Sequence, residues 1–167
     1  GRHGGACGGA RCCWQHHQTR LAHRRRQGPG PRDPLHGRNP AGTAFHIFRV
    51  AQMGVEAAHQ IDLQFESFNE IAPDDWTASD LAKWGETVRT ELLAWWAKEA
   101  NRSLDYLVPT YYGRRTMHDV FERTAWHSAQ HTRQMTLMLE TYGITPDHPL
   151  SVEDLKGLPV PDEVWDR

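Results

Sequence analysis

The sequence predicts an all-α domain, a bundle of helices joined by long connections. Three stretches, residues 43–58, 77–100 and 116–142, repeat apolar side chains at the helical period, and each begins with a threonine that can cap a helix. Proline or glycine interrupts the segments between them. The length of 167 residues suits one domain, and no apolar run approaches the roughly 18 residues of a membrane span.

Residues 1–42 differ in composition from the rest of the chain. They carry eight arginines and one acidic residue, a charge of +7, whereas residues 43–167 carry eleven basic and twenty acidic residues, a charge of −9. They are also rich in Gly and His and contain few large apolar residues. Such a segment buries too little surface to offset its chain entropy, so we expect disorder. A loose helix over residues 12–27 and a misread, out-of-frame start are the alternatives.

A nucleic-acid site and a zinc site are two functional interpretations of this N-terminal segment, and both have weaker support than a solvated tail. The basic tract Arg24–Arg26 lacks the aromatic residues and folded scaffold of a nucleic-acid site, and the remainder of the chain is acidic. The spacing C-x4-C-C-x2-H of the three cysteines lacks the paired clips of known zinc fingers. We therefore expect no nucleic-acid or membrane partner. The absence of cysteine from residues 43–167 is typical of a reducing compartment and predicts a cytoplasmic protein.

Residues 43–58 are predicted to form the first helix of the folded part, with Thr43 as its N-cap. His46 lies on the apolar face in the first turn, and Arg49 lies beside it. A lone histidine on such a face is more often a core residue than a ligand, so His46 gains meaning only beside other histidines. Residues 59–76 are acidic and end in Pro-Asp-Asp, which predicts a connector.

The second helix is predicted over residues 77–100, with Thr77 or Ser79 as its cap. Its aromatic stripe forms part of the core or lines a ligand cavity. Residues 101–115 contain one proline and one glycine, so we expect a crossover loop there. After the third helix, the proline-rich residues 143–167 are expected to be irregular and to pack back on the bundle.

The third helix, residues 116–142, begins with a capping box of Thr116 and Asp119 and carries His127 and His131. Four residues make about one turn, so both imidazoles project from one face. A face buried only for stability would carry Leu or Val there, because a buried imidazole without a partner loses its hydrogen bonds to water. A divalent metal is the natural shared partner. The zincin motif H-E-x-x-H is excluded, because serine follows the first histidine.

A third ligand must come from another helix, and His46 is the candidate. Bundles build metal sites from side chains on facing helices. Three neutral histidines would leave one coordination position open, which is the pattern of a catalytic zinc site. Bonds of about 2.0 to 2.1 Å to one ion then require ring nitrogens within about 3 to 4 Å of one another.

These residues resemble the DinB superfamily of four-helix bundles, which bind a divalent metal through three histidines. The likeness rests on His46 in AFHIFRV and on WHSAQH, which begins one residue before His127. It is closest in VPTYYG, ERTAWHSAQHTRQM and DLKGLPVPDEVWD, which are similar to DinB-like domains found alone or after a glutaredoxin-like domain in bacterial proteins. The resemblance covers about residues 43–167 and implies a first bundle helix that is replaced or degraded here.

The resemblance also implies a function. Characterised relatives include thiol-dependent isomerases and S-transferases that use small thiols such as mycothiol or bacillithiol. It implies a site of His46, His127 and His131 for zinc, or for nickel or iron, with a small thiol and an electrophilic acceptor as partners. Arg49 and Arg123 are candidates to hold carboxylates of these molecules, or else pair with acidic residues of the chain. The alternative function is a non-catalytic metal-binding module or a fragment of a larger fusion protein, and a homodimer is left open.

Overall fold

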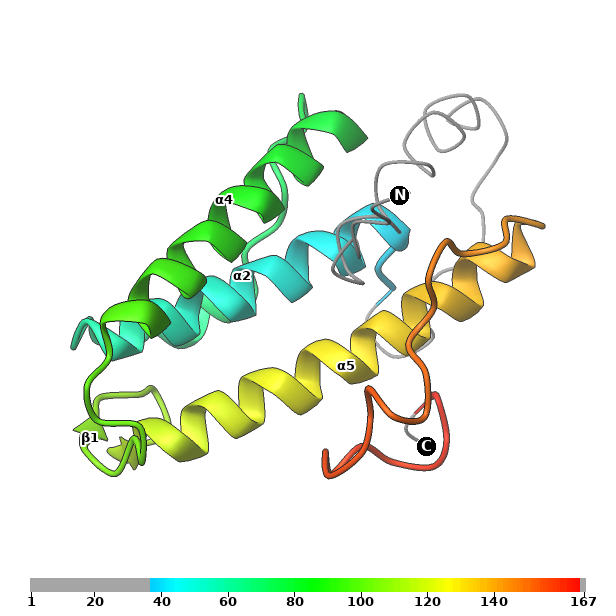
Figure 1. Cartoon of the computed structure of the whole chain (residues 1–167). Coiled ribbons are helices and arrows are strands. Elements are labelled where there is room, and N and C mark those ends of the chain that lie inside the picture. Colours follow the sequence, from blue (N-terminus) through cyan, green and yellow to red (C-terminus); the bar gives the residue numbers. More distant parts are fainter. Residues whose placement is uncertain (1–36, 166–167) are drawn as a thin grey trace, which may run out of the picture.

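The computed structural model describes residues 37–165, and this part of the chain is mostly helical (Figure 1). The predictions of disorder, of a loose helix and of a degraded first bundle helix fall mainly on residues 1–36, outside the described residues. Within residues 37–165, no helix combines the length and the apolarity needed to cross a membrane. The described elements are α2 (Pro40–Ala58), α3 (Phe65–Phe68), α4 (Ala78–Lys98), β1 (Leu107–Val108), β2 (Arg115–Thr116) and α5 (Met117–Thr141).

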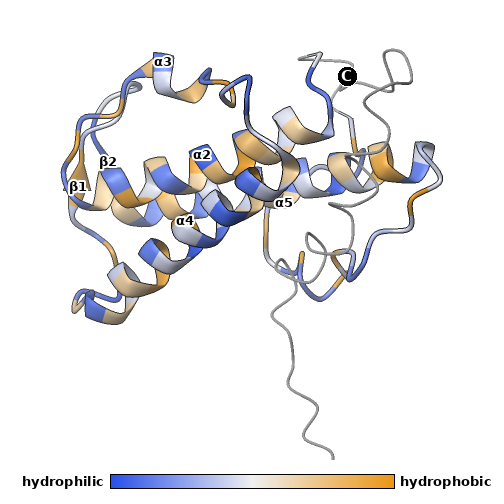
Figure 2. Ribbon diagram, turned by 90° about the horizontal axis from the view of Figure 1, so that it is seen from above, coloured by the Kyte–Doolittle hydropathy of each residue, from blue (hydrophilic) through white to orange (hydrophobic). Residues whose placement is uncertain are grey.

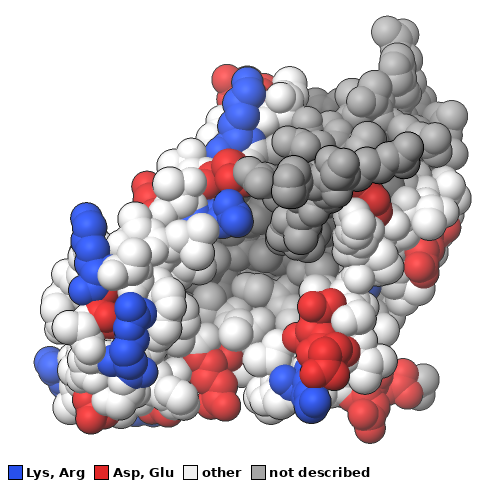
Figure 3. All heavy atoms as spheres, viewed as in Figure 1, with Lys and Arg blue, Asp and Glu red and all other residues white. Residues whose placement is uncertain are grey.

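Helix α2 is the centre of the described fold, because it packs against both α4 and α5 (Figure 1). The short helix α3 also contacts α2, and Figure 2 shows α3 and α4 on opposite sides of it. On the face seen in Figure 3, acidic and basic side chains are interspersed rather than gathered into one basic surface. The described elements are helices apart from one small hairpin, and the predicted all-α class is therefore confirmed for these residues.

The start of α2 differs from the prediction. Asn39, not Thr43, is the N-cap: its Oδ1 accepts a hydrogen bond of 2.8 Å from the backbone N–H of Gly42. Pro40 suits the first helical position because its φ is already helical and it has no N–H to leave unpaired. The helix thus begins three residues early, which places His46 in its second turn and puts the expected domain boundary at residue 42 inside the helix.

The N-caps of the other two long helices are those predicted from the sequence. Thr77 caps α4 in a full capping box, in which Asp80 accepts from the Thr77 backbone N–H at 3.0 Å. Thr116 caps α5 by accepting from the Asp119 N–H at 3.1 Å, which is one half of the predicted box. Gly143 follows the end of α5 with a φ of +68°, a conformation that glycine adopts at little cost.

The predicted crossover loop contains a short antiparallel hairpin. Leu107 pairs with Thr116, and Val108 pairs with Arg115. Strands of two residues are too short to show an alternating pattern in the sequence, which is why the pairing was not predicted. The residues after α5 form turns up to Trp165, and Trp165 packs on the core, as expected for this tail.

The core consists of two apolar clusters at opposite ends of the α2–α5 pair, and this division positions the functional site. One cluster contains Met53 of α2 and Val120 of α5, together with Trp95 of α4. The other contains Phe45 of α2 and Met135 of α5. The stretch of α2 and α5 between the clusters is therefore buried but holds polar side chains, namely His46, Arg49, His127, Gln130, His131 and Gln134.

Candidate metal centre

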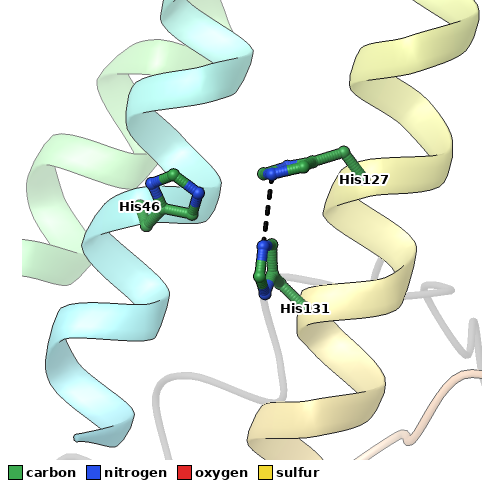
Figure 4. Close-up of side chains that lie close together, drawn as sticks. All are labelled: His46, His127 and His131. Atoms are coloured by element: carbon green, nitrogen blue, oxygen red, sulfur yellow. Dashed lines mark hydrogen bonds between the residues drawn. The ribbon is translucent and has the colours of Figure 1, made fainter. Parts of the chain in front are cut away.

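Three histidines meet between the two apolar clusters. His46 comes from α2, and His127 and His131 come from successive turns of α5 (Figure 4). One ring nitrogen from each lies within 4.8 Å of the other two, and the three side chains are buried. The Nε2 atoms of His127 and His131 are 3.2 Å apart. The set as a whole is somewhat wider than the 3 to 4 Å expected from the sequence.

A hydrogen-bond relay determines which nitrogen of His131 faces the cluster. The Nε2–H of Gln134 donates to the backbone carbonyl of Val164 at 3.0 Å. This bond turns the Gln134 Oε1 toward His131, whose Nδ1 lies 2.6 Å away and must therefore carry the hydrogen. The Nε2 of His131 is left with its lone pair directed at His127. An outer partner on the far nitrogen is the usual arrangement for a metal-binding histidine.

His127 is held neutral by its surroundings. Burial is the main cause that lowers its pKa from 6.5 to about 2, and the charges of His131, His46, Arg123 and Arg38 act in the same direction. Its buried Nδ1 has no hydrogen-bond partner among the described residues. A neutral imidazole is the form that binds metals, so His127 needs no deprotonation at physiological pH to serve as a ligand.

The donor set fits a divalent transition metal. Two bonds of about 2.0 to 2.1 Å at a tetrahedral centre place their nitrogens about 3.3 Å apart, close to the observed 3.2 Å between His127 and His131. His46 would have to approach more closely for all three to bind one ion. The described cluster contains only histidines, a donor type that suits zinc, nickel and iron better than magnesium or calcium.

Phe68 of α3 covers one side of the histidines. Its ring centroid lies 4.8 Å from that of His46 and 5.6 Å from that of His127, with the edges of the rings toward the faces. The segment that carries Phe68 is tied to α2, because Arg49 Nε donates to Glu70 Oε2 at 2.8 Å. The sequence reasoning missed Phe68, since nothing in an acidic connector indicates this contact. It also missed the role of Gln134, although that residue lies on the polar face shared by His127 and His131.

The two candidate arginines have different surroundings. Arg49 pairs with Glu70 and, through Nη1, with Glu56 at 2.9 Å, which is the acidic pairing given as its alternative role. Arg123 is exposed on α5 one turn before His127. Its Nη2 lies 3.5 Å from the hydroxyl of Tyr111, and no carboxylate of the described residues is within ion-pair distance of it. Only Arg123 of the two is therefore available to an external anion.

The fold and the site define a class: a helical protein with a buried cluster of three histidines that could hold a divalent metal. Comparisons of this chain with family models, with curated proteins and with solved structures found no match. The resemblance to the DinB superfamily therefore remains a prediction. The function proposed next depends on the geometry of the histidines and their neighbours.

Proposed function

We propose that this chain is a DinB-like protein that binds a divalent metal through His46, His127 and His131. We further propose that it is a cytoplasmic S-transferase or isomerase that uses a small thiol and an electrophilic acceptor. The observation that carries the metal proposal is the meeting of three buried imidazoles, from two helices, with ring nitrogens within 4.8 Å. Zinc is the preferred ion, with nickel and iron as alternatives, and the domain is a DinB-like four-helix bundle in which the first helix is replaced or degraded.

The chemistry follows from the donors. A bound divalent ion would supply the Lewis acidity that lowers the pKa of a thiol and favours its nucleophilic thiolate at neutral pH. Three protein ligands leave one tetrahedral position for such a thiol. Residues 43–167 contain no cysteine, so a small-molecule thiol would supply the nucleophile that this part of the chain lacks. The roles of the chain are to hold His131 through Gln134 and to limit water on the side covered by Phe68.

A non-catalytic metal-binding module is the second candidate, and the burial of the site favours it. The three histidines have exposed fractions of 2%, 8% and 6%, and Phe68 packs against two of them. Two polar atoms favour the enzyme instead. Thr43 lies one turn before His46, and its buried Oγ1, like Nδ1 of His127, has no hydrogen-bond partner among the described residues. Buried polar atoms of this kind are stabilised by a polar ligand.

Metal binding is tested first. The purified protein is stripped with a chelator and titrated with zinc, nickel and ferrous ions, and the same is done for His127→Ala and His131→Ala. Each substitution removes one of three ligands, and metal affinity should fall by at least about 100-fold. His118→Ala is the matched control, because His118 is an exposed histidine on the same helix and should leave affinity unchanged. Equal affinity in all four proteins would exclude the site.

Thiol binding separates the enzyme from the module. Calorimetry of the metal-loaded protein with a panel of small thiols, in buffers of different ionisation enthalpy, should show one proton released per thiol bound near neutral pH. The same signal should be absent from His127→Ala and His131→Ala. Binding of metal without binding of any thiol would favour the module. Thiol binding that survives removal of the metal would contradict the proposed chemistry.

A further inference from the structure

Arg123 is placed on an aromatic support next to the histidine cluster. Its guanidinium carbon lies 5.0 Å from the ring centroid of Tyr112, and its Nη2 lies 3.5 Å from the Tyr111 hydroxyl. Tyr111 in turn contacts Phe68, with ring centroids 6.3 Å apart, and Phe68 contacts His127. A continuous row of side chains thus connects the arginine to the proposed metal centre.

The charge of Arg123 is not neutralised within the described fold. Arg115 is also directed at Tyr112, at 5.5 Å from the ring centroid, and Arg114 precedes it in the hairpin. None of these three arginines has a carboxylate of residues 37–165 within 4.0 Å. By contrast, Arg49 is paired with two glutamates. Two guanidinium groups at one tyrosine ring, in an otherwise acidic domain, favour an anion from outside.

We propose that Arg123, supported by Tyr111 and Tyr112, binds a carboxylate of the small molecule whose other end reaches the histidine cluster. This inference rests on the proposed function and adds a substrate class to it, namely thiols that carry a carboxylate. The orientation of the guanidinium is limited by the Tyr112 ring and the Tyr111 hydroxyl, which lowers the entropy lost on binding. The tyrosines are positioning residues, and Arg123 makes the contact.

Helix geometry sets the approximate size of the ligand. Arg123 precedes His127 by four residues, slightly more than one turn, which is a rise of about 6 Å along α5. A thiol and a carboxylate separated by two to four carbons are of this order of length. Longer molecules with a carboxylate at the same spacing also satisfy the geometry, whereas neutral thiols of equal size lose the contact with Arg123.

The test uses the full chain loaded with cobalt, because a thiol that binds cobalt(II) produces a charge-transfer absorption that can be titrated. The probes are 3-mercaptopropionate and its neutral amide, with mercaptoacetate and 4-mercaptobutyrate as length variants. We expect the best carboxylate to bind the wild-type protein about tenfold more tightly than its amide, as one charge-assisted contact provides. Arg123→Gln should abolish this preference while still binding the amide.

Arg89→Gln is the matched control, since Arg89 is exposed on α4 and pairs with Glu86. It should keep the tenfold preference. Tyr112→Leu, which removes the aromatic support, should reduce the preference without abolishing binding of the amide. Equal binding of carboxylate and amide to the wild-type protein, or an unchanged preference in Arg123→Gln, would overturn this inference alone. Absorption from neither thiol would overturn both the proposed function and this inference.

Discussion

His131 and Gln134 lie three residues apart on α5, and the bond between Nδ1 and Oε1, 2.6 Å long, is the shortest link between the histidine cluster and its surroundings that we describe. The Gln134 side chain is almost fully buried and also donates to the Val164 carbonyl. It thus determines both the orientation of the His131 ring and its tautomer. A residue with this function around a metal ligand contributes to affinity without touching the ion.

The first prediction therefore concerns Gln134→Met, which keeps the side-chain volume and removes both hydrogen bonds. Metal affinity should fall by about 10- to 100-fold, because His131 loses the partner that fixes its ring. The free energy of unfolding should fall by about 1 to 3 kcal/mol, because a buried N–H is left without an acceptor. Metal titration and urea unfolding measure the two effects. Gln64→Met, at an exposed glutamine, should change neither, and an unchanged metal affinity in Gln134→Met would contradict the assigned role.

The site shows what sequence reasoning can and cannot provide. His127 and His131 could be paired from their spacing alone, because the period of a helix converts four residues into one face. His46 could be added to this pair as a third candidate ligand, because it lies on the apolar face of its helix and that face is expected to be buried in the bundle. Gln134 and Phe68 could not be assigned roles, since each depends on contacts with distant segments: Gln134 with Val164, thirty residues away, and Phe68 with both helices.

The same distinction holds for the fold. Thr77 and Thr116 could be identified as caps because the pattern is local, with a carboxylate three residues later. The cap of α2 was misplaced because Thr43 has the right side chain, whereas Pro40 directly after Asn39 is the stronger start signal. The partner of Arg49 was beyond local reasoning, because Glu70 lies twenty-one residues away in a connector.

A second prediction compares two glycines within helices. A Cβ added at Gly85 of α4 would lie 2.5 Å from the Phe48 ring of α2, whereas one at Gly54 would meet Thr124 Oγ1 at 3.4 Å, an ordinary contact. Gly85→Ala should lower the free energy of unfolding by about 1 to 2 kcal/mol, because overpacking outweighs the gain in helix propensity. Gly54→Ala should be neutral or stabilising by up to about 1 kcal/mol. Urea unfolding compares the two.

The control for this pair is the double variant Gly85→Ala with Phe48→Leu. A smaller side chain at residue 48 makes room for the added methyl group. Gly85→Ala should therefore lower the free energy of unfolding less in the Phe48→Leu protein than in the wild type. A Gly85→Ala protein as stable as the wild type would show that Phe48 adjusts without cost. It would then not be a fixed part of the α2–α4 contact.

A third prediction is a dependence of stability on pH. The pKa of His127 is about 2 in the folded protein, and its ordinary value, which applies to the unfolded chain, is 6.5. Above pH 6.5 the His127 side chain is therefore neutral in both the folded and the unfolded protein, and it contributes no pH dependence to stability. Below pH 6.5 His127 becomes protonated in the unfolded chain but stays neutral in the folded protein. The free energy of unfolding of the metal-free protein should therefore fall by up to about 1.4 kcal/mol per pH unit from this group.

The measurement is urea unfolding of the metal-free protein between pH 7.5 and 5, with His127→Gln alongside. His127→Gln should show a slope below pH 6.5 that is smaller by up to one proton than that of the wild type. His118→Gln, at an exposed histidine, should keep the wild-type slope. Identical slopes in wild type and His127→Gln would show that His127 is not held neutral by burial.

The last prediction concerns residues 161–164, which we call the C-terminal strap. Its backbone carbonyls accept hydrogen bonds from three side chains of α5, and the strap therefore lies along the same helix that carries two of the histidines. Arg133 donates to Pro161 at 2.6 Å and to Asp162 at 2.9 Å. Gln130 and Gln134 both donate to Val164, at 2.7 Å and 3.0 Å. Gln134 connects the strap to His131, so the attachment of the strap to α5 and the orientation of the His131 ring should be coupled.

Arg133→Met tests this coupling because it releases one end of the strap and leaves Gln134 in place. Hydrogen exchange should become faster in residues 158–165, and metal affinity should fall by a few-fold, less than in Gln134→Met, because only the support of the Val164 carbonyl is weakened. Arg102→Met is the control, since Arg102 also donates to a backbone carbonyl, that of Trp96 at 2.8 Å, but in the segment after α4. Faster exchange of the strap with unchanged metal affinity would show that Gln134 holds His131 independently of the strap.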